Sequence, residues 1–255
     1  ESEMFLPQVM SNAGYQTFMT GKWHVGHVSP EQVFDKVVLT RKGGMPPDTP
    51  ASYNRPKDEN DQNWLPWDTL QMGFWTGGKH WSEAQADVMI DYIKENAGSS
   101  RPSFMYCAFN APHDPRQSPQ EYVEQYSIES IPLPGNFLPE HPFNKEMGTG
   151  RGMRDEKLAP FPRTSYAVKK HIQEYYGIIS HLDEQIGRIL KALKESGMDK
   201  NTLIVFASDN GLAVGQHGFL GKQNLYDHSA KVPLIFSGSG IPKGQVRTDS
   251  VCREN

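Results

Sequence analysis

Three scarcities narrow the classes of protein to which this chain can belong. Its 255 residues include only two cysteines, Cys107 and Cys252, which make neither a disulfide framework nor a zinc-binding pattern. No apolar run approaches the roughly 20 residues of a membrane-spanning helix, and the first residues do not have the layout of a signal peptide. Basic residues are not in excess either: the formal net charge is -4, which argues against nucleic acid and anionic membranes as partners.

The arrangement of apolar residues predicts the fold class. Apolar runs of strand length alternate with amphipathic segments, which predicts an α/β protein with a mostly parallel central sheet between two layers of helices. Ser82 and Gln85 have the spacing of a capping box at the start of one helix. Strands are expected at 15–20, 102–110, 201–208 and 232–238, and helices at 4–13, 82–96 and 169–196.

Two segments depart from this alternation. Residues 29–81 and 114–168 are rich in proline, glycine and polar residues, and they are longer than ordinary loops in a compact domain. We expect them to be long loops on the substrate side of the fold, and we call them the covering segments. The first contains four tryptophans that offer flat faces to a sugar ring or, equally, a small core under a loop: Trp64, Trp67, Trp75 and Trp81.

Polar residues suited to chemistry follow three of the expected strands. The sequences are GKWH at 21–24, PHDP at 112–115 and SDNG at 208–211. Because ligands of parallel sheets bind outside the carboxyl ends of the strands, we expect these residues to share one site. Asp209 and Asn210 offer oxygen ligands for a hard cation, although the same pair also suits a plain turn.

Basic and titratable side chains accompany the same strand ends. Lys22 and Lys222 suit the binding of a tetrahedral anion, since an ammonium group acts as a point charge. His24, His113 and His217 are candidates for general acid, base or hydrogen-bond donor. Each of these residues alone is more often a surface or structural group, and only their convergence on one edge favours a functional site.

The motifs together resemble a known family. GYQTFMTGKWH resembles the second signature of the type I, formylglycine-dependent sulfatases, and APHDP resembles their Pro-His-x-Pro element. SDNG, followed by GQHGFLGK and VPLIF, resembles their metal-and-lysine segment in order and spacing. The resemblance implies a three-layer α/β/α sandwich of the alkaline-phosphatase superfamily, and it extends over nearly the whole chain.

The family's roles can be carried over position by position. By resemblance, Asp209 and Asn210 would ligate Ca²⁺ in preference to Mg²⁺, and Lys22 and Lys222 would hold the sulfate. His113 would protonate the leaving alcohol. The resemblance also implies that His24 contacts the nucleophile and that His217 contacts substrate. The implied activity is sulfuric ester hydrolysis, with a sulfated small molecule or glycan as substrate and glycan degradation as its setting.

One departure from the family pattern concerns the nucleophile. Type I sulfatases make formylglycine from a Cys/Ser-x-Pro-x-Arg motif, but the two nearest matches here, at 100–104 and 130–134, have Phe104 and Pro134 where arginine is required. There is also no Asp-Asp pair to supply further metal ligands. We therefore interpret residues 1–255 as a partial catalytic domain, incomplete at both ends and inactive by itself, whose formylglycine lies outside this chain.

Other interpretations stay open at this point. A phosphate or phosphonate ester hydrolase of the same superfamily and a non-catalytic protein that binds sulfated glycans are the alternatives. The resemblance also implies a formylglycine-generating maturation enzyme as a partner of the full-length protein. It further implies a periplasmic, secreted or lysosomal location.

Overall fold

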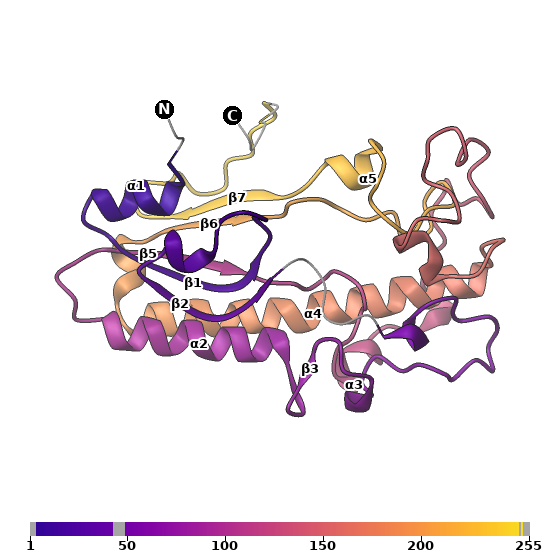
Figure 1. The fold of residues 1–255 in the computed structure, drawn as a ribbon, viewed down its shortest axis with the longest axis horizontal. Coiled ribbons are helices and arrows are strands. Elements are labelled where there is room, and N and C mark those ends of the chain that lie inside the picture. The colour runs from indigo at the N-terminus through magenta and orange to yellow at the C-terminus, as the bar shows by residue number, and fades with distance from the viewer. Residues whose placement is uncertain (1–3, 43–48, 250, 252–255) are drawn as a thin grey trace.

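The centre of the fold is a three-stranded parallel sheet (Figure 1). Strand β1 (Gln16–Trp23) lies in the middle and pairs with β2 (Lys36–Lys42) on one side and β5 (Ser103–Ala108) on the other. Strands β1 and β5 match two of the expected strands. The structure, a computed structural model, describes residues 4–42, 49–249 and 251.

Two long helices run along one face of this sheet and contact each other (Figure 1). They are α2 (Trp81–Asn96) and α4 (Ser165–Glu195), close to the predicted bounds. Helix α4 begins after Thr164, whose side-chain oxygen accepts a hydrogen bond from Ala167 N at 3.1 Å. It ends before Gly197, which has φ 74° and so takes the left-handed conformation that suits a helix stop.

The capping box predicted at the start of α2 is wrong. His80 is the N-cap, and its ring Nδ1 accepts the hydrogen bond from Ser82 N at 3.2 Å. Ser82 therefore lies inside the first turn. Gln85 is turned toward the sheet instead, where its Nε2 donates to Ala108 O at 3.0 Å.

Helices cover both faces of the sheet. Adjacent strand residues point to opposite faces, and on β1 Phe18 packs against α2 and α4, whereas Met19 packs on the other face. The short helix α1 (Leu6–Asn12) belongs to this second face, since Phe5 at its start joins the Met19 cluster. The fold is therefore the three-layer α/β/α sandwich with a parallel central sheet that the sequence predicts.

The last two strands differ from their prediction as buried strands. Strand β6 (Leu203–Ala207) pairs with β7 (Leu234–Gly238), and the two are antiparallel. Their side chains are largely exposed: Val205 is 53% exposed and Phe236 is 49% exposed. Apolar sequence identified both strands correctly. Ile204 of β6 packs against the cluster that contains Phe18 and residues of α2 and α4, whereas most other side chains of the pair are exposed.

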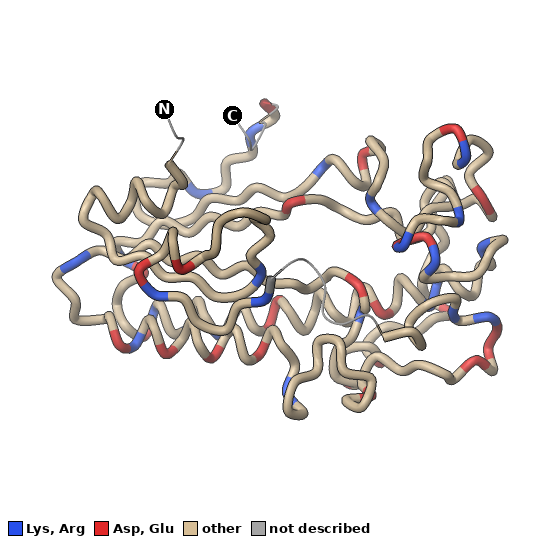
Figure 2. Tube along the Cα trace, viewed as in Figure 1, with Lys and Arg blue, Asp and Glu red and all other residues tan. Residues whose placement is uncertain are grey.

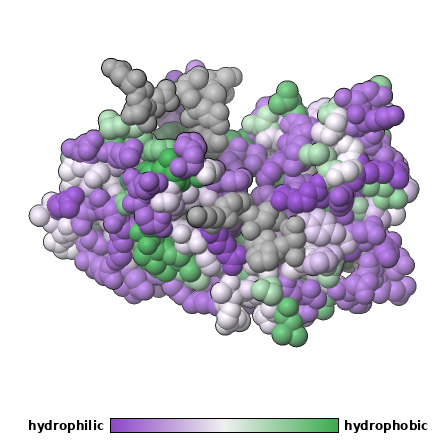
Figure 3. Space-filling model, in the orientation of Figure 1, coloured by the Kyte–Doolittle hydropathy of each residue, from purple (hydrophilic) through white to green (hydrophobic). Residues whose placement is uncertain are grey.

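The covering segments contain more regular structure than the sequence indicates. Residues 29–81 are not a loop throughout, because β2 lies within them and extends the sheet. A small antiparallel pair, β3 (Trp75–Thr76) and β4 (Lys79–His80), leads into α2. Figure 3 shows that this face of the molecule is mostly hydrophilic over the half that the covering segments form. Their expected position on the substrate side stays a prediction.

None of the helices in the described part of the chain is long and apolar enough to cross a membrane. Cys107 packs against the core as expected, and burial raises the pKa of its thiol to about 12; Cys252 lies outside the described residues. The short elements are α3 (Gln120–Val123), α5 (Asp227–Ala230) and the 3₁₀ turns at Pro30–Gln32, Pro50–Ser52, Thr69–Gln71, Ile128–Ser130, Asp155–Leu158 (η5) and Met198–Asn201.

Candidate functional site

Gly21 brings the ends of two strands together. Its φ is 106°, and a Cβ at this position would lie 2.0 Å from Ala108 O on β5 and 2.2 Å from Gln85 Nε2. Only glycine fits this close approach. As a result Lys22, the next residue of β1, and His113, which follows β5, come to the same edge of the sheet.

Two contacts join residues that are far apart in the sequence. Lys222 Nζ lies 2.8 Å from His113 Nε2, and Lys22 Nζ lies 4.0 Å from Asp209 Oδ2. The charges of Lys22 and Asp209 also act on the pKa of Lys222, which places both within electrostatic range of it. The structure therefore brings four predicted side chains to one site, where charges of both signs lie at the strand ends (Figure 2).

The protonation states at this site follow from burial and neighbouring charge. Burial lowers the pKa of His113 to about 4; Asp114 opposes this shift and Lys222 adds to it. The imidazole is therefore neutral at pH 7, and its Nε2 can accept a hydrogen bond from the Lys222 ammonium group. Burial also lowers the pKa of Lys222, while Asp155 and Asp209 oppose that shift.

Acidic residues from the second covering segment complete the surroundings. Asp155 is 1% exposed; its Oδ1 accepts from Arg154 Nε at 2.7 Å and its Oδ2 from Gln223 Nε2 at 2.6 Å. Asp114 is also buried, with Oδ2 3.8 Å from His113 Nδ1 and Oδ1 3.2 Å from Nη2 of the buried Arg116. Two carboxylates thus face a site that otherwise gathers positive charge.

Two predicted site residues do not join this group. His24 is exposed just beyond the end of β1, and in the described part of the chain no hydrogen bond or ion pair links it to the four converging residues. His217 instead packs against Tyr226, with ring centroids 4.1 Å apart, and its Nε2 lies 2.9 Å from Asn136 Nδ2. Its φ of 55° is held by the hydrogen bond from its N–H to Asn136 O.

The predicted metal ligands, Asp209 and Asn210, offer oxygen donors but not a complete set of ligands for a cation. Asp209 is well exposed at the end of β6, with a side chain 62% exposed, and its Oδ1 accepts from Asn210 N at 3.0 Å. A Ca²⁺ ion takes about six to eight oxygen ligands. Within residues 4–42, 49–249 and 251 no three histidine, cysteine or acidic side chains are grouped to hold a metal. The donor chemistry fits a hard cation, but only with further ligands from outside this group.

The tryptophans and arginines of the covering segments divide into buried and accessible groups. Trp64 and Trp81 are buried, and each lies under a guanidinium group, at 3.9 Å from Arg55 and Arg41 respectively. For these two the alternative of a small core is correct. Arg163 is buried too, but Arg154 is not, with a side chain 43% exposed.

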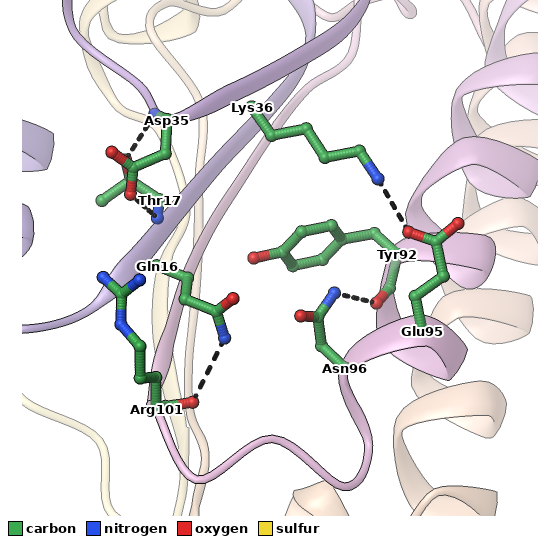
Figure 4. A pocket seen from close by; sticks show the side chains of 8 residues that line it. All are labelled: Gln16, Thr17, Asp35, Lys36, Tyr92, Glu95, Asn96 and Arg101. Atoms are coloured by element: carbon green, nitrogen blue, oxygen red, sulfur yellow. Dashed lines mark hydrogen bonds and ion pairs between the residues drawn. The ribbon is translucent and has the colours of Figure 1, made fainter.

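A pocket of about 360 Å³ lies at the opposite, amino-terminal edge of the sheet (Figure 4). Its charged groups are satisfied within the fold: Lys36 pairs with Glu95 at 2.7 Å, and Asp35 accepts from Thr17 N at 3.0 Å. These contacts tie β1, β2 and α2 together, so we assign this pocket a structural role. It is lined by Gln16, Thr17, Asp35, Lys36, Tyr92, Glu95, Asn96 and Arg101.

Sequence reasoning missed the acidic residues beside the site. Asp155 and Glu156 lie in a segment rich in charged and polar residues, where two adjacent carboxylates are usually solvated. No local pattern distinguishes them, because their burial depends on the packing of residues 155–163 against the loop that carries Lys222. Asp114 could have been noticed, since it directly follows His113.

Two lysines, a histidine and an aspartate thus come together beside the carboxyl-terminal edge of a parallel α/β sheet. Solved structures with this arrangement of sheet and helices have the alkaline-phosphatase and sulfatase fold. The family model described as Sulfatase matches residues 1–251, and the chain belongs to the sulfatase family. It is 30% identical to human iduronate 2-sulfatase over 91% of this chain and 44% of that protein. It is 35% identical to a sulfatase of Formosa agariphila over 61% of this chain and 31% of that protein.

Solved structures agree on the fold. The phosphonate monoester hydrolase of Silicibacter pomeroyi superposes with a TM-score of 0.69 at 22% identity, covering 93% of this chain and 53% of that one. A protein solved with its substrate, D-glucosamine-2-N,6-O-disulfate, superposes with a TM-score of 0.62 at 21% identity, covering 92% and 55%. This chain spans about a third to a half of the length of the curated relatives it matches.

Proposed function

We propose that this protein hydrolyses a sulfate ester and releases inorganic sulfate. The observation that carries the proposal is the convergence of Lys22, His113, Asp209 and Lys222 from four separate segments of the chain at one edge of the sheet. Membership of the sulfatase family supports the choice of sulfate as the anion. Two ammonium groups on one side of a tetrahedral group would neutralise the charge that develops during transfer.

In this proposal the two lysines bind the sulfate group and His113 protonates the leaving alcohol. The Lys222 ammonium group lies in hydrogen-bond contact with the neutral His113 ring, so this pair holds one proton beside the site. A negatively charged sulfate ester would stabilise the imidazolium form of His113. Binding of substrate would therefore raise the pKa of His113, so that the ring takes up a proton from solvent and donates it to the leaving oxygen, while Lys222 keeps its ammonium charge for the sulfate group.

The nucleophile would come from a part of the protein outside these 255 residues, because no Cys/Ser-x-Pro-x-Arg motif is present in them. A formylglycine there would supply the attacking oxygen, and a maturation enzyme would be needed to form it. His24 is exposed just beyond the end of β1, so its side chain is accessible to such a segment. Residues 1–255 alone would then be inactive.

A calcium ion would be held by Asp209 and Asn210 together with further ligands, which the described residues do not group around them. When bound, the ion would supply Lewis-acid polarisation of the sulfate oxygens. Asp209 is suited to this role because its carboxylate is accessible and lies beside Lys22 without a close ion pair. A hard cation prefers such oxygen ligands, which supports calcium over zinc.

The substrate class we favour is a sulfated carbohydrate. Arg154 is the arginine of the second covering segment best placed to meet a second anionic group, since it is half-exposed and its partner Asp155 lies near Lys222. Arg163 is buried, which leaves it less suited, and the partner of Arg151 is Glu140, whose carboxylate is not linked to Lys222 as that of Asp155 is. His217 stays a candidate for a more distant contact. We further propose a periplasmic, secreted or lysosomal location.

The test compares esters of the same alcohol in the full-length, matured protein. We expect 4-nitrophenyl sulfate to be hydrolysed with a kcat/KM well above that for 4-nitrophenyl phosphate or a phenylphosphonate monoester. A preference for phosphate or phosphonate by orders of magnitude would overturn the assignment in favour of the related hydrolases. Tight binding of sulfated glycans without turnover would favour a non-catalytic protein.

A further inference from the structure

Two adjacent acidic residues hold the chain on both sides of Lys222, through backbone amides before it and through a side chain after it. Glu156 accepts hydrogen bonds from Leu220 N at 3.0 Å and from Gly221 N at 2.9 Å. Asp155 Oδ2 accepts from the side chain of Gln223 at 2.6 Å. Residues 220 and 221 precede Lys222 and residue 223 follows it, so the dipeptide contacts the chain on both flanks of the lysine.

These contacts are buried, and the Glu156 carboxylate also pairs with the positive charge of Arg163. Arg163 Nη2 donates to Glu156 Oε2 at 2.5 Å, and both residues are 2% exposed. Arg163 also donates to Gly218 O at 3.2 Å, in the same loop as Lys222. Burying this ion pair is costly. It becomes favourable when every polar atom has a partner, and here the carboxylate meets that condition with three hydrogen-bond donors.

Gly221 makes this close approach possible. A Cβ at residue 221 would lie 2.8 Å from Asp155 Cβ and 2.6 Å from Gln223 Oε1. Any other residue would push the acidic dipeptide away from the loop. The close contact between the Lys222 loop and the carboxylates at 155 and 156 therefore requires glycine at residue 221.

We propose that Asp155 and Glu156 are positioning residues for Lys222, and we call them the acidic clamp. Lys222 lies outside any helix or strand and has a long flexible side chain, so its backbone needs another means of support. A displacement of about 1 Å at a reacting group can cost on the order of 100-fold in rate. The clamp fixes the backbone from which Nζ reaches His113. What the lysine binds there rests on the proposed function.

The chain offers a matched control in Glu140. It lies in the same covering segment and also pairs with an arginine, Arg151, at 2.6 Å. Its side chain also accepts a hydrogen bond from Asn144 at 2.8 Å. The backbone of Glu140 packs against Gly218, but among the described residues its carboxylate makes no hydrogen bond to residues 220–223. Glu140→Gln and Glu156→Gln thus remove the same kind of charge from the same segment, but only the second alters the clamp.

The first experiment measures amide hydrogen exchange in the full-length protein. Glu156→Gln places an NH₂ group where one carboxylate oxygen accepts, so we expect the amides of Leu220 and Gly221 to exchange at least tenfold faster. Glu140→Gln should leave them at the wild-type rate. Unchanged exchange in Glu156→Gln would overturn the clamp. This readout does not depend on the proposed function.

The second experiment is a double-mutant cycle on sulfate ester turnover. We expect Glu156→Gln to lower kcat/KM about 30-fold and Glu140→Gln to lower it less than twofold. In a Lys222→Ala background Glu156→Gln should cause no further loss, because the clamp acts through the lysine. An equal loss in both backgrounds would mean a merely structural role and would overturn the proposal.

A second variant covers the case in which Glu156→Gln does not fold. Asp155→Asn leaves the Glu156–Arg163 pair in place and weakens only the contacts of Asp155. We expect Asp155→Asn to lower kcat/KM threefold to tenfold in the wild-type background and to cause no further loss in the Lys222→Ala background. No loss in the wild-type background, or an equal loss in both backgrounds, would overturn the proposal. If the wild-type protein turns over no sulfate ester, the proposed function fails. Amide hydrogen exchange at residues 220–224 in Asp155→Asn then decides the clamp: faster exchange than in the wild type supports it, and unchanged exchange overturns it.

Discussion

The buried histidine His80 makes the stability of the protein depend on pH in a calculable way. Burial, together with a smaller contribution from the charge of nearby His181, lowers its pKa from 6.5 to about 3. Its ring is fully buried, with Nε2 2.9 Å from Gln117 O and Nδ1 accepting from Ser82 N. A proton on Nδ1 would remove that acceptor, so the folded state keeps the ring neutral.

The sign follows from comparing the two states. Between pH 6.5 and about 3 the unfolded chain binds a proton at this histidine and the folded protein does not. The stability that the protein gains from keeping His80 neutral is therefore fully present above pH 6.5, and it is lost as the pH falls from 6.5 towards 3. For one such histidine the loss is about 0.2 kcal/mol at pH 7 and about 2 kcal/mol at pH 5.

The assay is chemical unfolding of the full-length protein and of His80→Gln at pH 7 and pH 5. Glutamine does not titrate, and its amide can donate to Gln117 O. We expect the wild-type free energy of unfolding to fall by about 2 kcal/mol more than that of the variant between the two pH values. The matched control is His27→Gln, which removes an imidazole from the exposed surface. The same pH dependence in wild type and His80→Gln would refute the reasoning.

Three further predictions concern the site and its support. Lys222→Ala should lower kcat for a sulfate ester about 100-fold to 1,000-fold, corresponding to ~3 kcal/mol of transition-state stabilisation; steady-state kinetics and the melting temperature together check this, and a large loss of stability with unchanged turnover would contradict it. Arg55→Met should destabilise the protein by about 3–5 kcal/mol, because Arg55 Nη1 donates to Glu174 Oε1 at 2.6 Å and the carboxylate would stay buried without its partner. Denaturant unfolding measures the change, and a loss below about 1 kcal/mol would count against the prediction. Calcium should raise the melting temperature of the full-length protein, and Asp209→Ala should abolish most of that rise; an equal rise in the variant would place the calcium site elsewhere.

The sequence by itself determined the fold class and most of the candidate site. Local patterns identified strands β1, β5, β6 and β7 and both long helices, because periodicity and end signals act within one segment. The residues Lys22, His113 and Asp209 could be selected since each follows or ends a strand. Lys22 and His113 meet at one edge because they lie at the carboxyl ends of neighbouring parallel strands. Asp209 follows β6, which pairs with β7 in a separate sheet, so its approach to Lys22 depends on how the chain packs.

Only the tertiary structure decided which polar residues support that edge. Nothing near Asp155 and Glu156 in the sequence indicates that they are buried, because their partners lie at residues 220–223, more than 60 positions away. The same holds for His217, which turns to Tyr226 and Asn136, and for β2, which pairs with β1 inside a segment expected to be a loop. Burial and hydrogen bonding between distant segments depend on how the chain packs, and a local pattern does not encode that packing.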